Sequence, residues 1–357
     1  MSENYQQGAP GATAGSAVAP GPRPGPGPSD DVPAHARAAQ PRRRPRRRGP
    51  GPLTIFLFLL PGLVLFTALV LLPVLMAGYF SVWTWNGLGG FPPGSNTSFF
   101  SGFDNFSRAL SDDVFRGDLW RAFVLVALSI GVQLPFSLAL ALLLHQRFPG
   151  RTVFRLIFFA PYILSEVITG VLFRVVLRQD GGLLNELLEA IGLGTLVPTS
   201  GWLGTKEILL LVAFLVISWK YFGFHMIIYM AGRQNIPREL TEAATTDGAT
   251  AWQVFRHVTL PLMGPTIRVT IFLSIIGVIQ LFDMIFVLTA PNFGGPGRAA
   301  ETMAVTMYRH GLAGPEVGYA SAISVLMFLI CLVFALLYVQ FVMRRDIEGA
   351  VTTVGGR

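Results

Sequence analysis

Residues 53–80 read LTIFLFLLPGLVLFTALVLLPVLMAGYF, a stretch without a single charged side chain. Crossing the roughly 30 Å hydrocarbon core of a bilayer takes about 20 helical residues, so this stretch is long enough to span it. Backbone polar groups in lipid must be paired within the segment, and the residues do not alternate as barrel strands do. Further stretches of this kind lie at about Leu119–Leu144, Val153–Phe173, Ile208–Met230, Thr266–Ala290 and Ala320–Met343. The sequence therefore predicts an all-α polytopic membrane protein with six transmembrane helices.

The composition of the 357 residues agrees with lipid as the main solvent. Hydrophobic residues make up 52% of the chain, and charged residues only 13%, about half the share found in soluble domains. The single cysteine, Cys331, excludes an internal disulfide and a CxxC site. The five histidines are scattered and form no metal-ligand spacing, and no polar catalytic cluster stands out beyond the spans. We therefore expect no catalytic residues, no metal and no enzyme.

The two ends of the chain differ from the middle. Residues 1–52 are rich in Gly, Ala, Pro, Ser and Arg, which predicts a disordered tail. The arginines at 42–48 end this tail beside a span and lack interleaved aromatics, which favours attraction to membrane lipid over nucleic-acid binding. Residues 53–345 form the predicted six-span domain, and 346–357 a short second tail. Basic residues concentrate in the tails and in the loops after spans two and four, so both termini are expected in the cytoplasm.

The loop at 232–264, between spans four and five, predicts two helices joined by a glycine corner. Residues 238–245 are good helix formers. Asp247-Gly248 then breaks the helix, because glycine tolerates the left-handed backbone of a sharp corner. A second helix is expected at about 249–258, capped by Thr246 or Asp247 and ended by Pro261.

This second helix carries an apolar stripe that needs a partner surface. Trp252, Phe255 and Val258 recur at helical spacing. The stripe could lie in lipid headgroups or in a groove on another protein. The small residues Ala243 and Ala244 allow close backbone approach, which favours the groove.

The spacing of the loop resembles the EAA motif of binding-protein-dependent ABC importer permeases. Every fixed position matches, with Val258 standing where isoleucine is usual. Flanking residues resemble the carbohydrate-type branch, which includes maltose, glycerol-phosphate and oligosaccharide permeases, although Pro291-Asn292-Phe293 expands its Thr-x-Gly-Gly-Pro segment. The resemblance covers about residues 53–345. The motif residues are Glu242, Ala243, Ala244, Gly248, Val258, Leu260 and Pro261, and the flanking ones include Trp219, Gly223, Asp247 and Gly294-Gly295-Pro296.

The resemblance implies a type I ABC importer permease fold in a bacterial cell membrane. The loop would be the coupling helix, seated in a cleft of a separate ATPase, and the residues implied in coupling are Glu242, Ala243, Ala244, Asp247, Gly248, Leu260 and Pro261. ATP with magnesium would bind that ATPase, since neither Lys206 nor Lys220 follows a glycine as a phosphate-binding loop requires. The implied partners are two ABC ATPase subunits, a second permease that is identical or, more usually, different, and an extracellular solute-binding protein.

The implied cargo is a sugar or oligosaccharide, with a polyol, glycerol phosphate or another polar solute as alternatives. An ATP-independent secondary transporter is a further alternative, which leaves the loop unexplained. Three residues in the predicted spans are candidates for the solute pathway: Glu166, Trp219 and Asp283. A charge at mid-bilayer is expensive and usually faces a cavity or a partner. For Glu166 a structural contact is favoured, and for Asp283 both interpretations stand. For His225, in span four, a helix–helix contact is expected.

Overall fold

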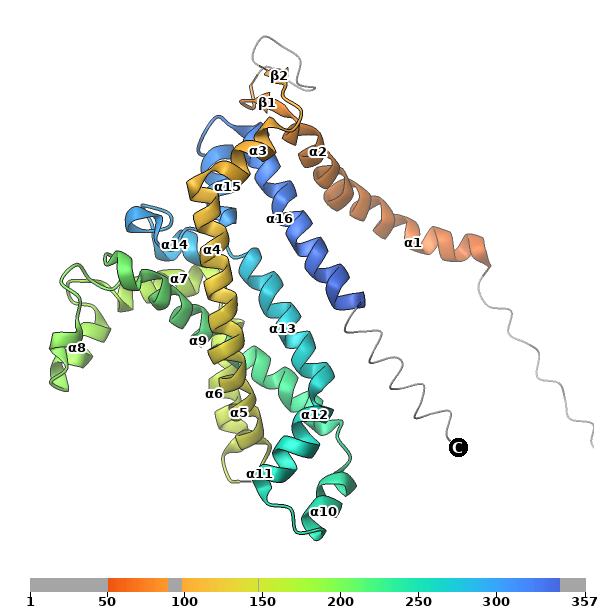
Figure 1. Cartoon of the computed structure of the whole chain (residues 1–357), viewed down its shortest axis with the longest axis vertical. Coiled ribbons are helices and arrows are strands. Elements are labelled where there is room, and N and C mark those ends of the chain that lie inside the picture. Colours follow the sequence, from red (N-terminus) through yellow and green to blue (C-terminus); the bar gives the residue numbers. More distant parts are fainter. Residues whose placement is uncertain (1–50, 89–97, 147, 341–357) are drawn as a thin grey trace, which may run out of the picture. The chain divides into compact units, whose positions relative to one another are not determined.

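The computed structural model describes residues 51–88, 98–146 and 148–340. Residues 1–50 of the first tail, with its arginine cluster, and the second tail lie outside the described residues, whereas Pro52 already begins a helix. By its internal contacts the chain divides into two units, residues 1–60 and 61–357. In the first unit the described residues begin a helix, and all other elements belong to the second unit (Figure 1).

Four helices of the described part are long and apolar enough to cross a membrane, at Leu53–Ser81, Asp113–His145, Lys206–Gln234 and Val317–Tyr338. The first comprises α1 (Pro52–Phe66), a π-helical turn at Thr67–Leu71 and α2 (Leu72–Ser81). The second comprises α4 (Asp113–Leu128), a π turn at Ser129–Gln133 and α5 (Leu134–His145). The third is α9 (Lys206–Gln234), and the fourth contains α16 (Val317–Tyr338). If each of two bent helix pairs counts as one span, the total is six, which confirms the polytopic all-α class.

Proline accounts for the π turns. Pro73, Pro135 and Pro261 each stand at the second position of the helix that follows a π turn. A proline lacks the N–H of the regular ladder, and its ring collides with the carbonyl four residues earlier. Widening the preceding turn relieves that collision and lets the helix continue. The helix runs from Ala251 to Leu262, so it includes Pro261 and ends one residue after it, close to where the end was expected.

The third predicted span is broken. Two helices, α6 (Arg151–Ile163) and α7 (Glu166–Val176), meet at 100°. Leu164 and Ser165 between them are extended, and the Ser165 hydroxyl caps α7 by accepting the Ile168 N–H at 3.2 Å. The prediction of one continuous span at Val153–Phe173 is thus wrong. The apolar run contains Pro161 and, four residues later, a serine that caps a new helix. Glu166 lies in the first turn of α7 rather than in mid-span.

The fifth predicted span also differs from the structure. The helix Ala251–Leu262, built of α11 (Ala251–Val254), a π turn (Phe255–Thr259) and α12 (Leu260–Leu262), meets α13 (Gly264–Ile279) at 65°. Helix α13 ends at Ile279, and the chain turns before α14 (Asp283–Leu288). A continuous span to Ala290 is therefore wrong. Asp283 stands exposed at the start of a short helix.

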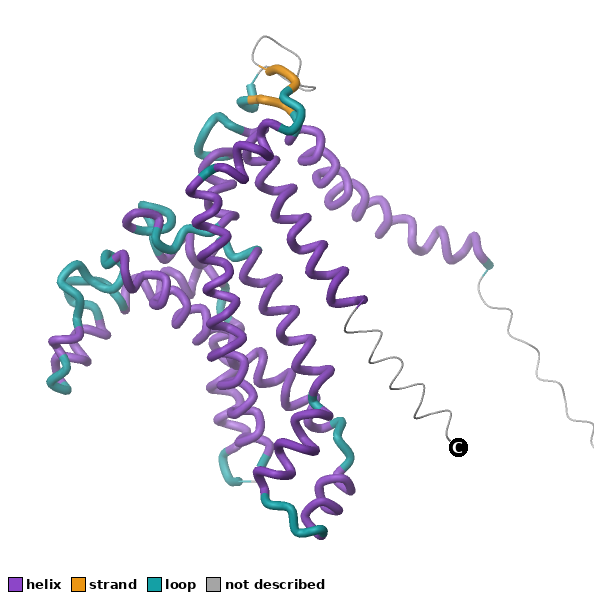
Figure 2. Tube along the Cα trace, viewed as in Figure 1, coloured by secondary structure: helices purple, strands orange, loops and turns teal. Residues whose placement is uncertain are grey.

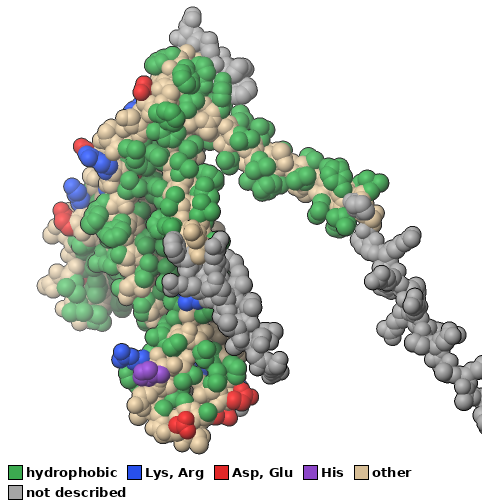
Figure 3. Space-filling model, turned by 45° about the vertical axis from the view of Figure 1, so that its right-hand side comes forward, with side chains coloured by type: hydrophobic (Ala, Val, Ile, Leu, Met, Phe, Trp, Pro, Cys, Tyr) green, Lys and Arg blue, Asp and Glu red, His purple; other side chains and the backbone are tan. Residues whose placement is uncertain are grey.

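The second unit is mostly helical, as the tube drawing shows in purple (Figure 2), and α9 is the most buried of the four long helices. It packs against α5, α6, α13 and α14, and its buried side chains include Leu209, Ala213, Phe214 and Met226. Its contact with α6 is so close that a Cβ on Gly223 would lie 2.0 Å from the carbonyl oxygen of Phe158. Elsewhere hydrophobic side chains cover most of the face seen in Figure 3, as expected for helices that face lipid.

Short elements join the long helices. They are β1 (Trp83–Trp85) paired antiparallel with β2 (Ser98–Phe100), α3 (Asp104–Ser111), α8 (Leu183–Ala190), α15 (Met303–Gly311) and 3₁₀ turns at Gly194–Leu196 and Pro296–Arg298. Helix α16 packs against α2, α3, α15 and β1. An ion pair ties α3 to the start of α16, since the Arg108 guanidinium donates to both carboxylate oxygens of Glu316 at 2.8 and 3.1 Å.

Candidate functional site

The 232–264 loop contains the expected corner. Helix α10 (Arg238–Thr246) ends in two hydrogen bonds, from Gly248 N–H to Thr245 O and from Ala249 N–H to Ala244 O, both 3.0 Å. This pattern is the Schellman cap, in which the residue after the helix takes a left-handed backbone. Gly248 has that backbone, with φ at +84°. The corner is thus fixed by the local sequence.

The second helix of the loop begins two residues later. Thr250 caps α11 in a capping box: its hydroxyl accepts the Gln253 N–H, and the Gln253 side chain accepts the Thr250 N–H. The expectation that Thr246 or Asp247 caps this helix is wrong. The Thr246 hydroxyl instead donates back to Glu242 O at 2.9 Å, within α10. The capping box prevails because it satisfies two N–H groups at once.

The tip of the loop presents its motif residues to the surroundings. Glu242, Ala243, Asp247 and Gly248 are exposed, and Ala244 is half-buried. A Cβ on Gly248 would meet no atom within 4 Å. Two large apolar side chains of the loop are also unburied, Trp252 at 64% exposure and Leu240 at 46%. Exposed apolar groups beside small residues are typical of a surface that a partner protein covers.

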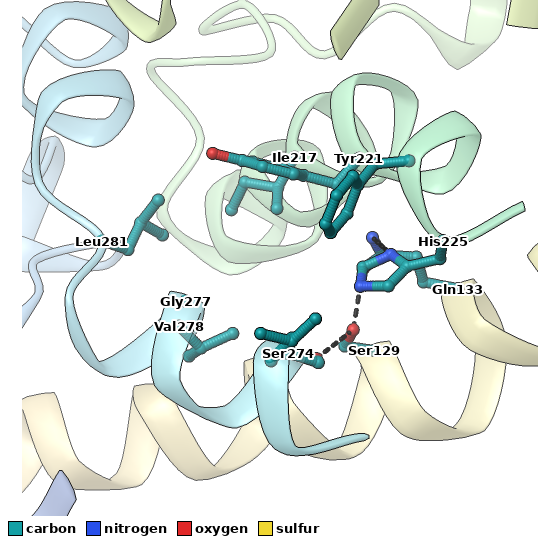
Figure 4. A pocket seen from close by; sticks show the side chains of 11 residues that line it. Ser129, Gln133, Ile217, Tyr221, His225, Ser274, Gly277, Val278 and Leu281 are labelled. Carbon is teal, nitrogen blue, oxygen red and sulfur yellow. Dashed lines mark hydrogen bonds between the residues drawn. The ribbon is translucent and has the colours of Figure 1, made fainter. Parts of the chain in front are cut away.

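A second feature lies between the long helices, where Figure 4 shows a pocket lined by polar side chains. Its volume is about 170 Å³. A chain of hydrogen bonds runs along it: Ser274 Oγ donates to Ser129 Oγ at 2.7 Å, and Ser129 Oγ donates to Gln133 Oε1 at 2.7 Å. Gln133 Nε2 lies 3.5 Å from His225 Nδ1. Tyr221 and Phe224 add aromatic walls, so the pocket combines apolar surface with a few convergent polar groups, as ligand sites do.

The predicted pathway residues lie around this pocket rather than on its wall. Tyr221 lines the pocket, and its hydroxyl donates to the Glu166 carboxylate at the start of α7. Trp219 packs edge-on against Phe173 of α7, with ring centroids 5.0 Å apart. Asp283 is exposed and does not line the pocket. The structure thus brings Glu166 to the pocket through Tyr221, and keeps Trp219 and Asp283 outside its lining.

Lys220, next to Tyr221, binds the α6 side of the break between α6 and α7. Lys220 is only 3% exposed. Its ammonium donates to the carbonyl oxygens of Tyr162, at 3.3 Å, and of Leu164, at the end of α6. These carbonyls lack helical partners, and a helix C-terminus attracts a cation. One turn of α9 therefore fastens both α6 and α7.

Sequence reasoning missed most of the pocket. Ser129, Gln133, Tyr221 and Ser274 were not candidates, and His225 was expected only as a helix–helix contact, which its approach to Gln133 provides. A signal was present, because uncharged polar side chains are few within these apolar runs. The sequence does not show that these side chains face one another, because it does not fix how each helix is rotated.

Comparisons with known proteins agree with this arrangement. The family described as "Binding-protein-dependent transport system inner membrane component" matches residues 133–346, more than half of the chain. A solved bacterial ABC transporter involved in the import of the acidic polysaccharide alginate contains a chain of similar fold, with a TM-score of 0.68 and 25% identity. The likeness covers 82% of this chain and 96% of that one. The fold and the loop thus define a multi-pass transport subunit.

Curated relatives of this chain are also transport permeases. A probable ABC transporter permease protein of Pyrococcus horikoshii is 33% identical over 286 residues, covering 80% of this chain and 94% of the relative. A probable starch degradation products transport system permease of Thermoanaerobacterium thermosulfurigenes is 29% identical, covering 82% and 94%. The arabinooligosaccharides transport system permease of Bacillus subtilis is 30% identical, covering 67% and 74%.

The chain belongs to the inner-membrane permeases of binding-protein-dependent ABC importers. It is a multi-pass component of the cell membrane that works with a periplasmic binding protein, and it is a transport subunit rather than the ATPase. The predicted family and fold are therefore confirmed. The alternative of an ATP-independent secondary transporter is excluded by this membership.

Proposed function

We propose that the chain carries a sugar or oligosaccharide, and that the pocket of Figure 4 holds part of this cargo during transport. The hydrogen-bond chain from Ser274 through Ser129 and Gln133 to His225 carries the proposal. Such groups can exchange their mutual bonds for bonds to a cargo rich in hydroxyls. The relatives from Thermoanaerobacterium and Bacillus, which transport starch products and arabinooligosaccharides by name, support the same class.

The lining of the pocket distinguishes between the possible cargoes. Its residues include serine, glutamine, histidine and tyrosine, but no Lys, Arg, Asp or Glu from the part of the chain that the structure describes. A phosphate or carboxylate buried there would have no ionic partner on this chain, and burying an unpaired charge is expensive. A neutral sugar or a polyol therefore fits better than glycerol phosphate.

The 232–264 loop supplies the proposed coupling to ATP. Its exposed tip, with Glu242, Ala243 and Gly248, would seat in a cleft of a separate ATPase subunit that binds ATP with magnesium. Leu260 and Pro261 would form the end of the second loop helix, just before its 65° bend into α13. Two ATPase subunits and a second permease would complete the importer, with this loop and both termini in the cytoplasm. Closure of the ATPases would then switch the spans between inward-facing and outward-facing states.

Transport by the reconstituted importer tests the cargo proposal. The complex is placed in vesicles with its binding protein, whose cargo is first identified by calorimetry. Replacing either Ser129 or Ser274 by alanine should raise the half-saturating concentration of a neutral oligosaccharide by roughly three- to tenfold, since a lost hydrogen bond contributes about 1 kcal/mol.

Ser218→Ala is the matched control, because Ser218 lies on α9 and its hydroxyl has no hydrogen-bond partner in the structure. It should transport as the parent does. Uptake of glycerol phosphate in place of a neutral sugar, or pocket variants indistinguishable from Ser218→Ala, would reject the proposed cargo site.

A further inference from the structure

A polar cavity lies at the base of the 232–264 loop, separate from the pocket of Figure 4. Its volume is about 360 Å³. It is lined by His145 at the end of α5, Arg233 near the end of α9, and Arg238, Thr241 and Glu242 on α10. The cavity thus joins the ends of two spans to the first helix of the loop.

Two further arginines of α6 complete the charge around this cavity. Arg151 and Arg155, with Arg233 and Arg238, are close enough to His145 to act on it electrostatically. Arg155 donates to Leu144 O at 2.7 Å, while its Nε is buried without a hydrogen-bond partner. We call the cavity with these four arginines the arginine pocket.

Glu242 is the one carboxylate that the described part of the chain contributes to the lining of the arginine pocket, and it forms no ion pair with the four arginines. No other carboxylate of that part lies within ion-pair distance of the four guanidinium groups. The opposite end of the second unit is different, since Asp113, Asp118, Glu301 and Glu316 pair with arginines there. Four cations in one place repel one another, so an anion that bound among them would relieve the repulsion.

The chemistry of the site indicates which anion. A guanidinium presents paired N–H donors in a fork that matches phosphate oxygens, and arginine is preferred where phosphate is bound. Basic pockets between transmembrane helices on the cytoplasmic side bind phosphate headgroups of lipids. Attraction of loop arginines to the cytoplasmic side explains why they are in these loops, but it does not require them to converge on one cavity.

We propose that the arginine pocket binds the phosphate of an anionic phospholipid headgroup. Its place at the ends of α5 and α9 sets it at the membrane surface, within reach of a lipid rather than only of soluble anions. A headgroup bound there would contact α10 through Arg238 and so steady the base of the loop. The inference rests on the proposed function in one respect, the placement of this face at the cytoplasmic leaflet.

Lipid retention by the purified importer tests the inference. The full complex is extracted in mild detergent and mixed with phosphatidylglycerol or phosphatidylcholine, and the bound lipids are counted by native mass spectrometry. Replacing Arg233 and Arg238 by glutamine should reduce retained phosphatidylglycerol on the order of fivefold for each arginine. The corresponding double lysine variant should keep most of it, and phosphatidylcholine should not be retained by any of them.

The matched control removes two arginines outside the pocket, Arg174→Gln with Arg256→Gln, and should retain phosphatidylglycerol as the parent does. Equal retention by the Arg233 and Arg238 glutamine variant, or an equal loss in the control, would overturn the inference. So would displacement of the lipid by millimolar inorganic phosphate with arginine-dependent binding of that phosphate, which would identify a soluble anion instead. Retention is measured without cargo, so a failure of transport in the pocket variants leaves this result independent.

Discussion

Gly248 is where a single backbone angle constrains the loop. At φ +84° an L-residue with a side chain is strained by about 1 to 2 kcal/mol, although space for a Cβ is free. Gly248→Ala should therefore leave membrane insertion intact and strongly reduce uptake, because the helix end would leave the geometry that a partner must fit. Gly248→Asn should be milder, since asparagine visits this region more readily. Uptake and ATPase activity of the reconstituted importer are the measurements.

Gly78→Ala is the control for this change. Gly78 lies within α2 with helical geometry and open space around it, so alanine should be tolerated or slightly stabilising. Normal uptake by Gly248→Ala would show that the corner does not need its left-handed residue and would refute the coupling role.

Glu316 gives a prediction about pH. Its hydrogen bonds to Arg108 hold the pKa of this carboxyl below its usual range. A lowered folded-state pKa means that the pair stabilises the protein above the ordinary carboxyl pKa, and that this stabilisation is lost as pH falls through the folded value. Glu316→Gln should thus lower the melting temperature slightly at neutral pH, and the difference from the parent should shrink at acidic pH.

The effect should be small, because both side chains are more than a third exposed and solvent screens the pair. Asp113→Asn, which removes the more exposed pair with Arg116, should change melting less at either pH. Melting followed by tryptophan fluorescence measures both variants. A Glu316→Gln deficit that grows on acidification would contradict the assigned ion pair.

At the scale of elements, the break between α6 and α7 depends on a side chain from a third helix. Lys220→Met removes the donor to the carbonyls of Tyr162 and Leu164 while keeping an apolar chain of similar length. Leaving buried carbonyls unsatisfied should cost about 1 to 3 kcal/mol and loosen the 100° bend. Spin labels at the exposed positions Val153 and Val175 should show a broader distance distribution.

Lys206→Met is the counterpart, since Lys206 stands exposed in the first turn of α9. It should change neither the distance distribution nor the melting temperature. Should Lys220→Met keep a distribution as narrow as that of Lys206→Met, the ammonium would not be what holds the bend.

These breaks also define what the sequence could predict about elements. Length and hydropathy located the apolar runs, and glycine chemistry located the corner at Gly248. Neither distinguishes a straight span from two helices at 100°, because Ser165 is one small residue in an apolar run and its role as a cap depends on extended backbone. The sequence placed the end of the second loop helix at Pro261, within one residue of Leu262, but did not reveal the π turn that admits the proline.

At the scale of the whole molecule, the pocket depended on an arrangement that the sequence does not contain. Ser129 and Gln133, Tyr221 and His225, and Ser274 come from three separate helices. Each is one polar side chain in an apolar stretch, and only the relative rotation of α9, α13 and the π turn before α5 brings them together. The sequence singled out Glu166 because charge in an apolar run is conspicuous, whereas neutral hydroxyls are not.

The importer as a whole should depend on its separate ATPase. Proteoliposomes that contain this chain with its proposed permease partner should not accumulate cargo, and adding the ATPase with ATP and loaded binding protein should start accumulation. Crosslinks from cysteines placed along 238–258 should capture the ATPase, whereas cysteines in α8 should not. Accumulation without ATP would remove the basis for the coupling loop.

The two caps of the loop have a mechanical consequence. The Schellman cap ends at Ala249 and the capping box begins at Thr250, so no freely rotating residue separates the two helices. The two loop helices therefore move together when α10 is displaced. The movement changes the angle at the 65° bend between the loop and α13. Inserting even one flexible residue at the corner would let the two helices move independently. The ATPase would then hydrolyse nucleotide without moving the membrane helices.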